Sequence, residues 1–344
     1  MKILVTGGAG YIGSHACIEL LELGHKVLVL DNLSNSKLDV LHKVSKIVNI
    51  RLNTNQDKDN EHDFSFIQID IRDKESLKKV FARNRVDAVM HFAGLKSVNE
   101  SIEKPTEYYE NNVIGSINLF EVMKQFNCKT IVFSSSATVY GDSHKIPIKE
   151  SFPLSPTNPY GKSKVAIEEL LQNLFESDNG WHIGILRYFN PVGAHKSRLI
   201  GEDPTGIPNN LMPYIMKVAS GQLETLSVFG DDYDTHDGTG VRDYIHVMDL
   251  AMVHTKILDV LMKKPQILTI NVGTGIGYSV LDIVKAFEKA SNKKIAYKVV
   301  GRRAGDVDIC YADPSFTKEK LGWEAKYTLD DMCQDSWNYK LNNL

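Results

Sequence analysis

The chain has 344 residues, 42% of them hydrophobic, which is enough to bury a large core as one large domain or two unequal ones. Its 40 basic and 43 acidic side chains give a formal net charge of −3, and neither sign forms a long block, so neither a nucleic-acid nor a membrane partner is indicated. The four cysteines are scattered and lack the spacing of metal ligands, so no metal site is expected. MKILVTGG does not resemble a leader, and no apolar run reaches about 18 residues. We therefore expect a cytoplasmic protein that acts on a small molecule.

Short apolar runs alternate with helix-length segments through the first half of the chain. The runs are KILVT (2–6), KVLVL (26–30), FSFIQI (64–69), VDAVMHFA (86–93), KTIVFSSS (129–136) and HIGILRYFN (182–190). We expect helices between them at 11–23, 36–48, 73–84, 105–126 and 160–176. This alternation predicts βαβ units and therefore an α/β fold with a Rossmann-type doubly wound parallel sheet.

From about residue 191 the pattern changes to shorter segments punctuated by proline and glycine. They include LMPYIMKVASG (211–221), LSVFGDDY (226–233), VRDYIHVMDLAMVH (241–254), ILTINVG (267–273) and SVLDIVKAFEKA (279–290). We interpret 191–344 mainly as a smaller α/β substrate lobe, some of whose segments return to the first domain, 1–190. The polar stretch 53–63 contains no apolar residue and is expected to be an exposed loop.

The glycine-rich stretch TGGAGYIG follows the first strand and opens a helix. Gly7, Gly10 and Gly13 allow a tight turn, close approach of the backbone to a pyrophosphate, and close packing of helix on sheet. Asp31 ends the second strand, where a carboxylate accepts hydrogen bonds from an adenosine ribose and repels a 2′-phosphate. Alone, Asp31 would be a turn or capping residue. With the glycines it predicts binding of NAD rather than NADP.

The stretch NPYGKSK (158–164) places Tyr160 and Lys164 four residues apart at the start of a helix, so both point to the same side. A tyrosine has an ordinary pKa of about 10, and a nearby buried ammonium makes its hydroxyl more acidic. Ser136, at the strand end in FSSSATVYG, can hydrogen-bond a substrate hydroxyl whose proton Tyr160 removes. An isolated YxxxK would be a solvated helix surface, but the combination with Ser136 favours a catalytic site.

Seven motifs together carry a resemblance to a known family: VTGGAGYIGSH, HFAGLK, SSSATVYGD, PYGKSK, LRYFNPVGAH, GIPNNLMPYI and DGTGVRDYIHVMDLA. From Lys2 to about Asp335 the chain resembles the extended short-chain dehydrogenase/reductases and, within them, the enzymes that invert C4 of UDP-glucose and UDP-galactose. The resemblance implies an isomerase of galactose metabolism, a homodimer with UDP-sugar substrates. Tightly bound NAD would oxidise the sugar transiently to a 4-keto form, because the C4 hydrogen is not acidic, while Tyr160 moves the hydroxyl proton.

The resemblance also implies the remaining site residues. Those near the cofactor, beside the ones already named, are Tyr11, Ile12, Asn32, Asn35, Asp70, Ile71, Phe92, Lys96 and Tyr188. Those near the UDP-sugar, with Ser136, are Asn190, Asn210, Leu211, Ser227, Phe229, Arg242, Arg303, Asp306 and Cys310. Guanidinium groups match phosphate oxygens, which suits Arg242 and Arg303 to the diphosphate.

One departure from the family concerns Cys310, which stands where some bacterial members carry tyrosine. The smaller side chain leaves room beside C2 of the sugar, so UDP-GlcNAc and UDP-GalNAc are also expected substrates. A buried structural cysteine is compatible with either outcome.

Three alternatives stay open. The first is a nucleotide-sugar 4,6-dehydratase, in which an Asp–Glu pair stands where this chain has Ala137 and Thr138. The others are a dehydrogenase that releases its NAD, and a non-catalytic NAD-binding sensor. A sensor has no need of the combination of Ser136, Tyr160 and Lys164.

Overall fold

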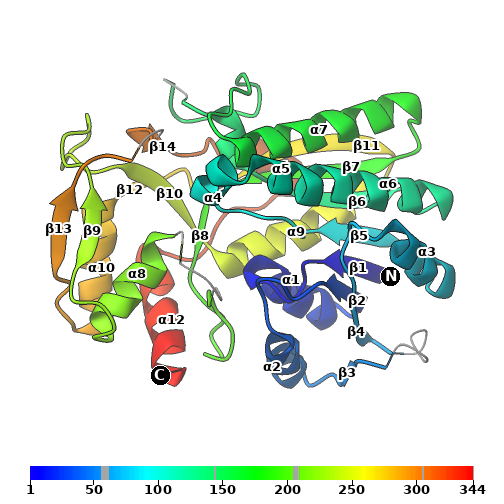
Figure 1. Cartoon of the computed structure of the whole chain (residues 1–344), viewed down its shortest axis with the longest axis horizontal. Helices are drawn as coiled ribbons and strands as arrows, with labels where there is room; N and C mark the ends of the chain where they lie inside the picture. The colour runs from blue at the N-terminus through cyan, green and yellow to red at the C-terminus, as the bar shows by residue number, and fades with distance from the viewer. Residues whose placement is uncertain (56–61, 143–144, 204–207, 209, 304–305, 344) are drawn as a thin grey trace. The chain divides into compact units, whose positions relative to one another are not determined.

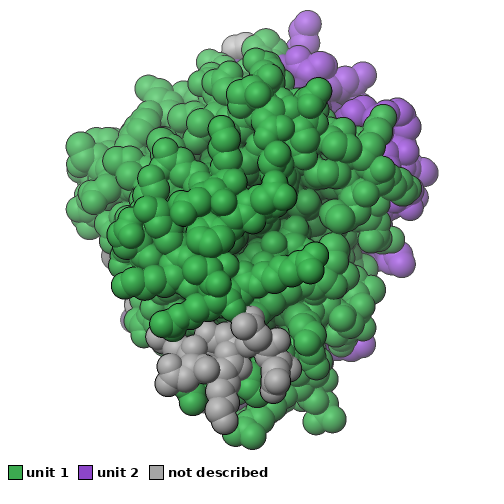
Figure 2. Space-filling view, turned by 90° about the vertical axis from the view of Figure 1, so that its right-hand side faces the viewer, with its two compact units in different colours: residues 1–141, 153–187, 251–270 green, residues 142–152, 188–250, 271–344 purple. Residues whose placement is uncertain are grey.

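The computed structural model describes residues 1–55, 62–142, 145–203, 208, 210–303 and 306–343 (Figure 1). They form two compact units, coloured separately in Figure 2. Unit 1 comprises Met1–Gly141, Pro153–Arg187 and Ala251–Ile270, and unit 2 comprises Asp142–Phe152, Tyr188–Leu250 and Asn271–Leu344. The chain therefore passes repeatedly between the units, and the functional boundary expected after residue 190 stays a prediction. The expected loop 53–63 lies largely outside the described residues.

The largest sheet has eight strands in the order β11-β7-β6-β5-β1-β2-β4-β3. The strands are β1 Lys2–Thr6, β2 Lys26–Asp31, β3 Leu52–Asn53, β4 Phe64–Gln68, β5 Ala88–His91, β6 Thr130–Ser136, β7 His182–Tyr188 and β11 Gln266–Val272. β1 pairs in parallel with β2 and β5, β2 with β4, and β5 with β6. The predicted Rossmann-type sheet is confirmed. β11 joins it as an edge strand, although it follows β7 by nearly 80 residues.

Helices cover this sheet where the alternating pattern predicts them. They are α1 Tyr11–Glu22, α2 Leu38–Val48, α3 Lys74–Arg83, α6 Gly115–Gln125 and α7 Pro159–Ser177, and α9 Val247–Leu261 continues into unit 1 from unit 2. Figure 1 shows α3, α6 and α7 on one face of the sheet, with α1 on the other. Leu119 of α6 and Ile167 of α7 are buried in one apolar cluster with Val89 of β5 and Ile131 of β6, because the apolar stripes of these helices face the sheet.

The segment 105–126, expected to be one regular helix, is helical over nearly all of this range but is not a regular α-helix. It consists of α5 Pro105–Tyr108, a π-helical segment Tyr109–Ile114 and then α6. A further helix, α4 Val98–Glu103, was not expected from the sequence. A π-helical turn widens the helix locally, and its position cannot be read from apolar periodicity.

The order of strands reverses at β1, which lies between β2 and β5. The loops that follow β1 and β5 therefore leave the same edge of the sheet side by side. A Cβ atom added to Gly7 would come within 2.7 Å of the backbone nitrogen of Ala93. Doubly wound sheets bind ligands at such a reversal, outside the carboxyl ends of their strands.

Unit 2 is built around β10 Val241–His246. β10 pairs with β8 Asn190–Val192, β12 Gly277–Ser279 and β14 Ile309–Cys310, while β9 Leu226–Phe229 pairs with β13 Tyr297–Val300. The helices are α8 Leu211–Ala219, α10 Val280–Ser291, α11 Ser315–Leu321 and α12 Leu329–Asn342. Ile215, Phe287 and Trp337 from three of these helices share one apolar core. In the described part of the chain, no helix is both long and apolar enough to cross a membrane.

Candidate active site

The glycine loop between β1 and α1 closes because its key positions carry no side chain. Gly7 has φ of +70°, which disfavours any other residue. A Cβ atom on Gly13 would lie 2.3 Å from the carbonyl oxygen of Gly7. Gly10 stands immediately before α1, and no side chain caps this helix end. The loop and the uncapped helix N-terminus have a geometry that suits a pyrophosphate, and Tyr11 and Ile12 lie in the first helical turn.

Asp31 lies at the end of β2 and faces the glycine loop. Its carboxylate accepts hydrogen bonds from the Ala9 amide at 3.1 Å, and from the Leu33 amide and the Ser36 hydroxyl, both at 2.9 Å. The side chain is 9% exposed. The structure thus places Asp31 at the strand end where the ribose-binding carboxylate of a dinucleotide site is found.

The other predicted cofactor residues of this part of unit 1 lie on the two segments that follow β2 and β4. The Asn32 side-chain amide donates to Asp70 at 3.0 Å. Hydrogen bonds from Arg72 hold the pKa of Asp70 at about 2, so this carboxylate is an ion near neutral pH. Ile71 is buried against Gly115, and Asn35 is exposed. Of the two residues predicted after β5, Phe92 contacts the ring of His254 and Lys96 is exposed.

Lys164 is buried beneath the carboxyl end of β6. Its Nζ donates to the carbonyl of Ser134 at 2.9 Å, and the side chain is 4% exposed. The same nitrogen lies 4.8 Å from the ring centroid of Phe133 and 5.8 Å from that of Tyr160. Burial lowers the pKa of Lys164 to about 8, an effect that the negative charge of Glu168 partly opposes. An ammonium group is therefore held next to Tyr160.

The start of α7 explains why Tyr160 and Lys164 face the sheet. The Asn158 side chain caps the helix by accepting from the Gly161 amide at 2.9 Å, and Pro159 occupies the first helical position. A Cβ atom on Gly161 would lie 2.9 Å from the Thr138 carbonyl, so the helix begins very close to the segment after β6. Lys162, between the two predicted residues, is exposed.

Ser136 ends β6 and is 7% exposed. Its Oγ accepts hydrogen bonds from the backbone amide of Thr138 at 3.2 Å and from the Thr138 hydroxyl at 3.0 Å. Since both contacts use the oxygen as acceptor, the hydroxyl hydrogen of Ser136 can be donated elsewhere. All three predicted catalytic residues, Ser136, Tyr160 and Lys164, belong to unit 1. Because α7 contacts Ser134 and Thr138, these three residues lie together at the carboxyl end of β6.

Asn112, in the π-helical segment, was missed by the sequence reasoning. Its side chain accepts from the Leu95 amide at 2.8 Å and donates to the Leu95 carbonyl at 3.0 Å and the Ser163 hydroxyl at 3.2 Å. Asn112 thereby fixes the loop after β5 to α7, between Tyr160 and Lys164. The widened helical turn that presents Asn112 gives no periodic signal in the sequence.

Two pairs of the predicted substrate residues of unit 2 are in contact with each other, and a third pair lies opposite in neighbouring strands. Arg242 lies opposite Cys310 in the pairing of β10 with β14, and its guanidinium is 3.9 Å from a carboxylate oxygen of Asp306. The Arg303 guanidinium stacks on the ring of Phe229 at 3.8 Å. The other predicted substrate residues are Ser227 on β9, Asn190 on β8, Asn210, which donates to Glu202 at 2.6 Å, and Leu211 at the start of α8. Tyr188, predicted near the cofactor, is the last residue of β7.

Asp243 is a second residue that sequence reasoning missed, and it orders this part of unit 2. Its buried carboxylate accepts from the Thr274 amide and hydroxyl and from the Gly275 and Ala312 amides, at 2.7–3.1 Å. These bonds join β10 to the segment that carries Cys310. The only sequence signal is an aspartate within a strand, next to Arg242.

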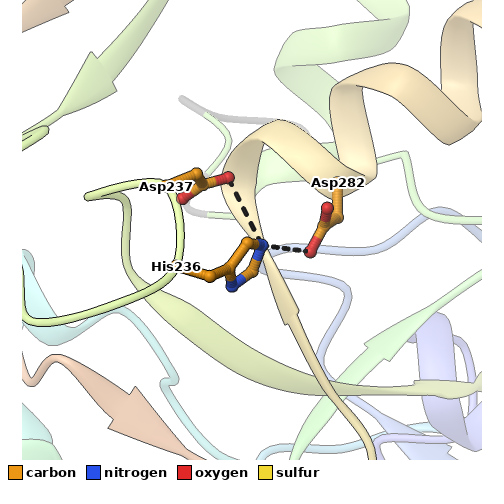
Figure 3. Close-up of side chains that lie close together, drawn as sticks. All are labelled: His236, Asp237 and Asp282. Atoms are coloured by element: carbon orange, nitrogen blue, oxygen red, sulfur yellow. Dashed lines mark ion pairs between the residues drawn. The ribbon is translucent and has the colours of Figure 1, made fainter.

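A polar cluster in unit 2 comprises His236, Asp237 and Asp282 (Figure 3). The His236 Nε2 atom lies 3.7 Å from Asp237 and 3.2 Å from Asp282. Both carboxylates already accept hydrogen bonds: Asp237 from Thr239 and Ser279, and Asp282 from the Ser279 amide in the capping box of α10. The cluster therefore secures a helix start, and the expected absence of a metal stays a prediction.

Comparison with known proteins places this geometry in a family. The family model described as GDP-mannose 4,6 dehydratase matches residues 4–336. A UDP-glucose 4-epimerase of Bacillus subtilis is 53% identical over 344 residues, which cover 100% of this chain and 98% of that protein.

Two solved structures extend the comparison. The UDP-glucose 4-epimerase of Bifidobacterium longum, solved in complex with NAD+ and UDP, is 48% identical with a TM-score of 0.93, covering 100% of this chain and 99% of that one. The UDP-Glc/GlcNAc 4-epimerase of Campylobacter jejuni is 34% identical with a TM-score of 0.83, covering 99% of both chains. The relation predicted from the motifs is thus confirmed, and the chain belongs to the UDP-glucose 4-epimerase family of NAD-dependent extended short-chain dehydrogenase/reductases.

Proposed function

We propose that the protein interconverts UDP-glucose and UDP-galactose by inverting C4 with the help of bound NAD. The observation that carries this proposal is the burial of the Lys164 ammonium, one helical turn from Tyr160, against the end of the strand that carries Ser136. Such an arrangement, beside a glycine loop that fits a dinucleotide, suits proton removal coupled to hydride transfer. The full-length similarity to UDP-glucose 4-epimerases supports the substrate.

The proposed chemistry divides between the cofactor and the side chains of unit 1. The glycine loop and Asp31 would hold NAD, and the bound cofactor would supply reversible hydride exchange at C4 of the sugar, which allows the hydride to return to the opposite face. Tyr160 takes the proton of the 4-hydroxyl and later returns it. Lys164 favours the phenolate form of Tyr160 by its positive charge, which acts strongly because it is buried. Ser136 donates a hydrogen bond to the reacting oxygen and orients it.

Inversion also requires that the sugar turn while the nucleotide stays bound. In our proposal Arg242 and Arg303 hold the diphosphate by charge-assisted hydrogen bonds. Phe229 offers an apolar face and Ser227 a hydroxyl on the same side of β9 for the uracil, and Asp306 binds the ribose. Asn190, Asn210 and Leu211 complete the proposed substrate contacts.

A dehydratase reaction is disfavoured by the residues that follow Ser136. Elimination of water needs a further acid and base, whereas the corresponding residues here are Ala137 and Thr138. The Thr138 hydroxyl already donates to Ser136 at 3.0 Å. Neither residue has an ordinary pKa that would let it exchange protons near neutral pH. The matching family model is described by a dehydratase activity, so this alternative is included in the test.

The test is an assay of purified protein without added NAD. Wild-type protein is expected to convert UDP-galactose to UDP-glucose, and Tyr160→Phe and Lys164→Met to lose at least about a hundredfold in kcat, the usual scale of general-base catalysis. Lys162→Met changes an exposed lysine of the same motif and is the matched control. A 4-keto-6-deoxy product would instead indicate a dehydratase. Turnover only with added NAD would indicate a dehydrogenase-like site, and no turnover at all a sensor.

We propose further that UDP-GlcNAc and UDP-GalNAc are interconverted. Cys310 is smaller than tyrosine and lies beside Arg242, the proposed phosphate ligand. Conversion of both sugar types by wild type, and selective loss of the N-acetylated substrates in Cys310→Tyr, are the expected results. Wild-type protein that turns over only UDP-glucose and UDP-galactose would contradict this proposal.

The homodimer and the cytoplasmic location are also proposals. The four cysteines, Cys17, Cys128, Cys310 and Cys333, are free thiols in the structure, which suits a reducing compartment. Exposed apolar side chains of unit 1 support the proposed dimer.

A further inference from the structure

A buried network of four polar side chains lies behind the proposed catalytic residues of unit 1. Its centre is the ion pair between Glu168 of α7 and Arg187 of β7, whose closest nitrogen and oxygen atoms are 2.6 Å apart. Both side chains are less than one-tenth exposed. The Ser135 hydroxyl donates to Glu168, and Arg187 donates to the Tyr140 hydroxyl at 2.9 Å.

The members of this network come from four consecutive elements of the site. Each of three stands beside a residue with a proposed role: Ser135 beside Ser136, Glu168 one helical turn from Lys164, and Arg187 beside Tyr188. Tyr140 ends the 3₁₀ segment Ala137–Tyr140 that follows Ser136. The network therefore connects α7 to the end of β6, to the segment after it, and to the end of β7.

A buried ion pair is weak evidence for stability, because desolvation of two charges offsets their attraction. Its geometry is more informative. The Arg187 Nε and a terminal nitrogen contact the carboxylate together, at 3.1 and 2.6 Å from the same oxygen of Glu168. A planar guanidinium that also reaches Tyr140 satisfies these contacts in one orientation only.

We propose that the Glu168–Arg187 pair is a positioning device that holds α7 in register with the end of β6, and so keeps Tyr160 and Lys164 against Ser136. This inference rests on the proposed function of those three residues. Glu168 and Arg187 touch neither substrate nor cofactor in this proposal and act through their neighbours.

The network also has an electrostatic effect on Lys164. The titratable groups that face Lys164 are Glu168 and Tyr160 on its own helix and His91 on β5. Burial lowers the pKa of His91 to about 3, so His91 is neutral and Glu168 is the anion of this set. The negative charge of Glu168 opposes the lowering of the Lys164 pKa by burial and helps to keep Lys164 protonated.

The test uses Glu168→Gln, which removes the charge but keeps the size of the side chain. We expect kcat to fall by about tenfold or more, with a much smaller change in KM. The alkaline limb of the pH profile of kcat should also move to lower pH, because Lys164 loses its proton at a lower pH without the negative charge of Glu168. Arg187→Lys keeps the positive charge but loses the planar guanidinium group, so kcat should fall while the alkaline limb of its pH profile moves little. Glu169→Gln, the exposed neighbour on α7, is the matched control and should change neither.

The outcomes separate this inference from the proposed function. The positioning role alone would be overturned if wild type is active, Tyr160→Phe is inactive, and Glu168→Gln has an unchanged kcat and pH profile. Inactive wild type would overturn both. If Glu168→Gln does not fold, Ser135→Ala is measured instead, because it removes one hydrogen bond from the carboxylate. A severalfold lower kcat at unchanged melting temperature supports the role, and an unchanged kcat refutes it.

Discussion

Lys164 shows how a single residue can serve chemistry at the expense of stability. A lysine buried to 4% exposure with one backbone hydrogen bond loses most of its hydration, and its lowered pKa measures that loss. A protein that only needed to fold would place an apolar side chain here. The location of the charge next to Tyr160 is therefore best explained by the proposed reaction.

We predict that Lys164→Met is more stable than wild type at pH 7 when both are free of NAD. Wild-type Lys164 has a pKa of about 8 in the folded state against 10.5 unfolded, so between these values the unfolded chain binds more protons and stability rises with pH. The gain at pH 7 should be at most about 3 kcal/mol at 1.36 kcal/mol per pKa unit. Urea unfolding at pH 7 and at about pH 9.5 should show the difference shrinking with pH. A less stable variant at pH 7 would contradict this prediction, and Lys162→Met serves as control.

At the scale of elements, the site is assembled where segments are forced very close together. The glycine loop touches the loop after β5 at Ala93, and the start of α7 touches the segment after β6 at Thr138. Gly7 and Gly161 make these approaches possible, because a Cβ atom at either position would clash with backbone atoms, and moving the backbone would cost free energy.

We predict that Gly13→Ala weakens both the fold and the retention of NAD. The added Cβ would lie 2.3 Å from the Gly7 carbonyl oxygen and 2.8 Å from the Gly8 Cα, so the loop must shift. Overpacking of this kind costs about 1–3 kcal/mol. Thermal melting and the NAD content of purified protein measure the two effects. Gly301→Ala, where no atom lies within 4 Å of an added Cβ, should leave both unchanged.

At the scale of the whole molecule, the chain is divided into two units that do not follow each other in sequence. α9 crosses from unit 2 to unit 1, and β11 then adds to the large sheet. Each unit has its own apolar core. The proposed cofactor and catalytic residues lie mainly in unit 1 and the proposed sugar-nucleotide residues mainly in unit 2, so we expect neither unit alone to be active.

We predict that unit 1 also carries the contact surface of a homodimer. Ile102 on α4 is 60% exposed, and Tyr109 and Ile114 in the π-helical segment are 41% and 50% exposed. A second copy that covers these side chains would remove apolar area from water. Light scattering after size-exclusion chromatography should give twice the mass of one chain for wild type and one chain mass for Ile114→Asp. Ile276→Asp, at a similarly exposed position of unit 2, should remain dimeric, and a monomeric wild type would contradict the prediction.

The local pattern of the sequence was sufficient to predict the main elements of the sheet domain, and the proposed chemistry of its motifs rests on the same local pattern. Strand and helix periods depend on neighbouring residues, and the roles expected of Gly7, Tyr160 and Lys164 follow from spacing within one turn. For the same reason six strands of the large sheet, β1, β2, β4, β5, β6 and β7, and the helices α1, α2, α3 and α7 were predicted to within a few residues of their ends. The two-residue strand β3 and the place of β11 in this sheet were not predicted.

Contacts between distant segments were decided only by the tertiary structure. The burial of Lys164, the pairing of Arg242 with Cys310 and the addition of β11 to the sheet each join residues far apart in the chain. The Glu168–Arg187 network belongs to the same class, because a glutamate on a helix and an arginine on a strand look like surface residues until packing removes them from water. Local periodicity reports which face of an element is apolar, but not which partner covers that face.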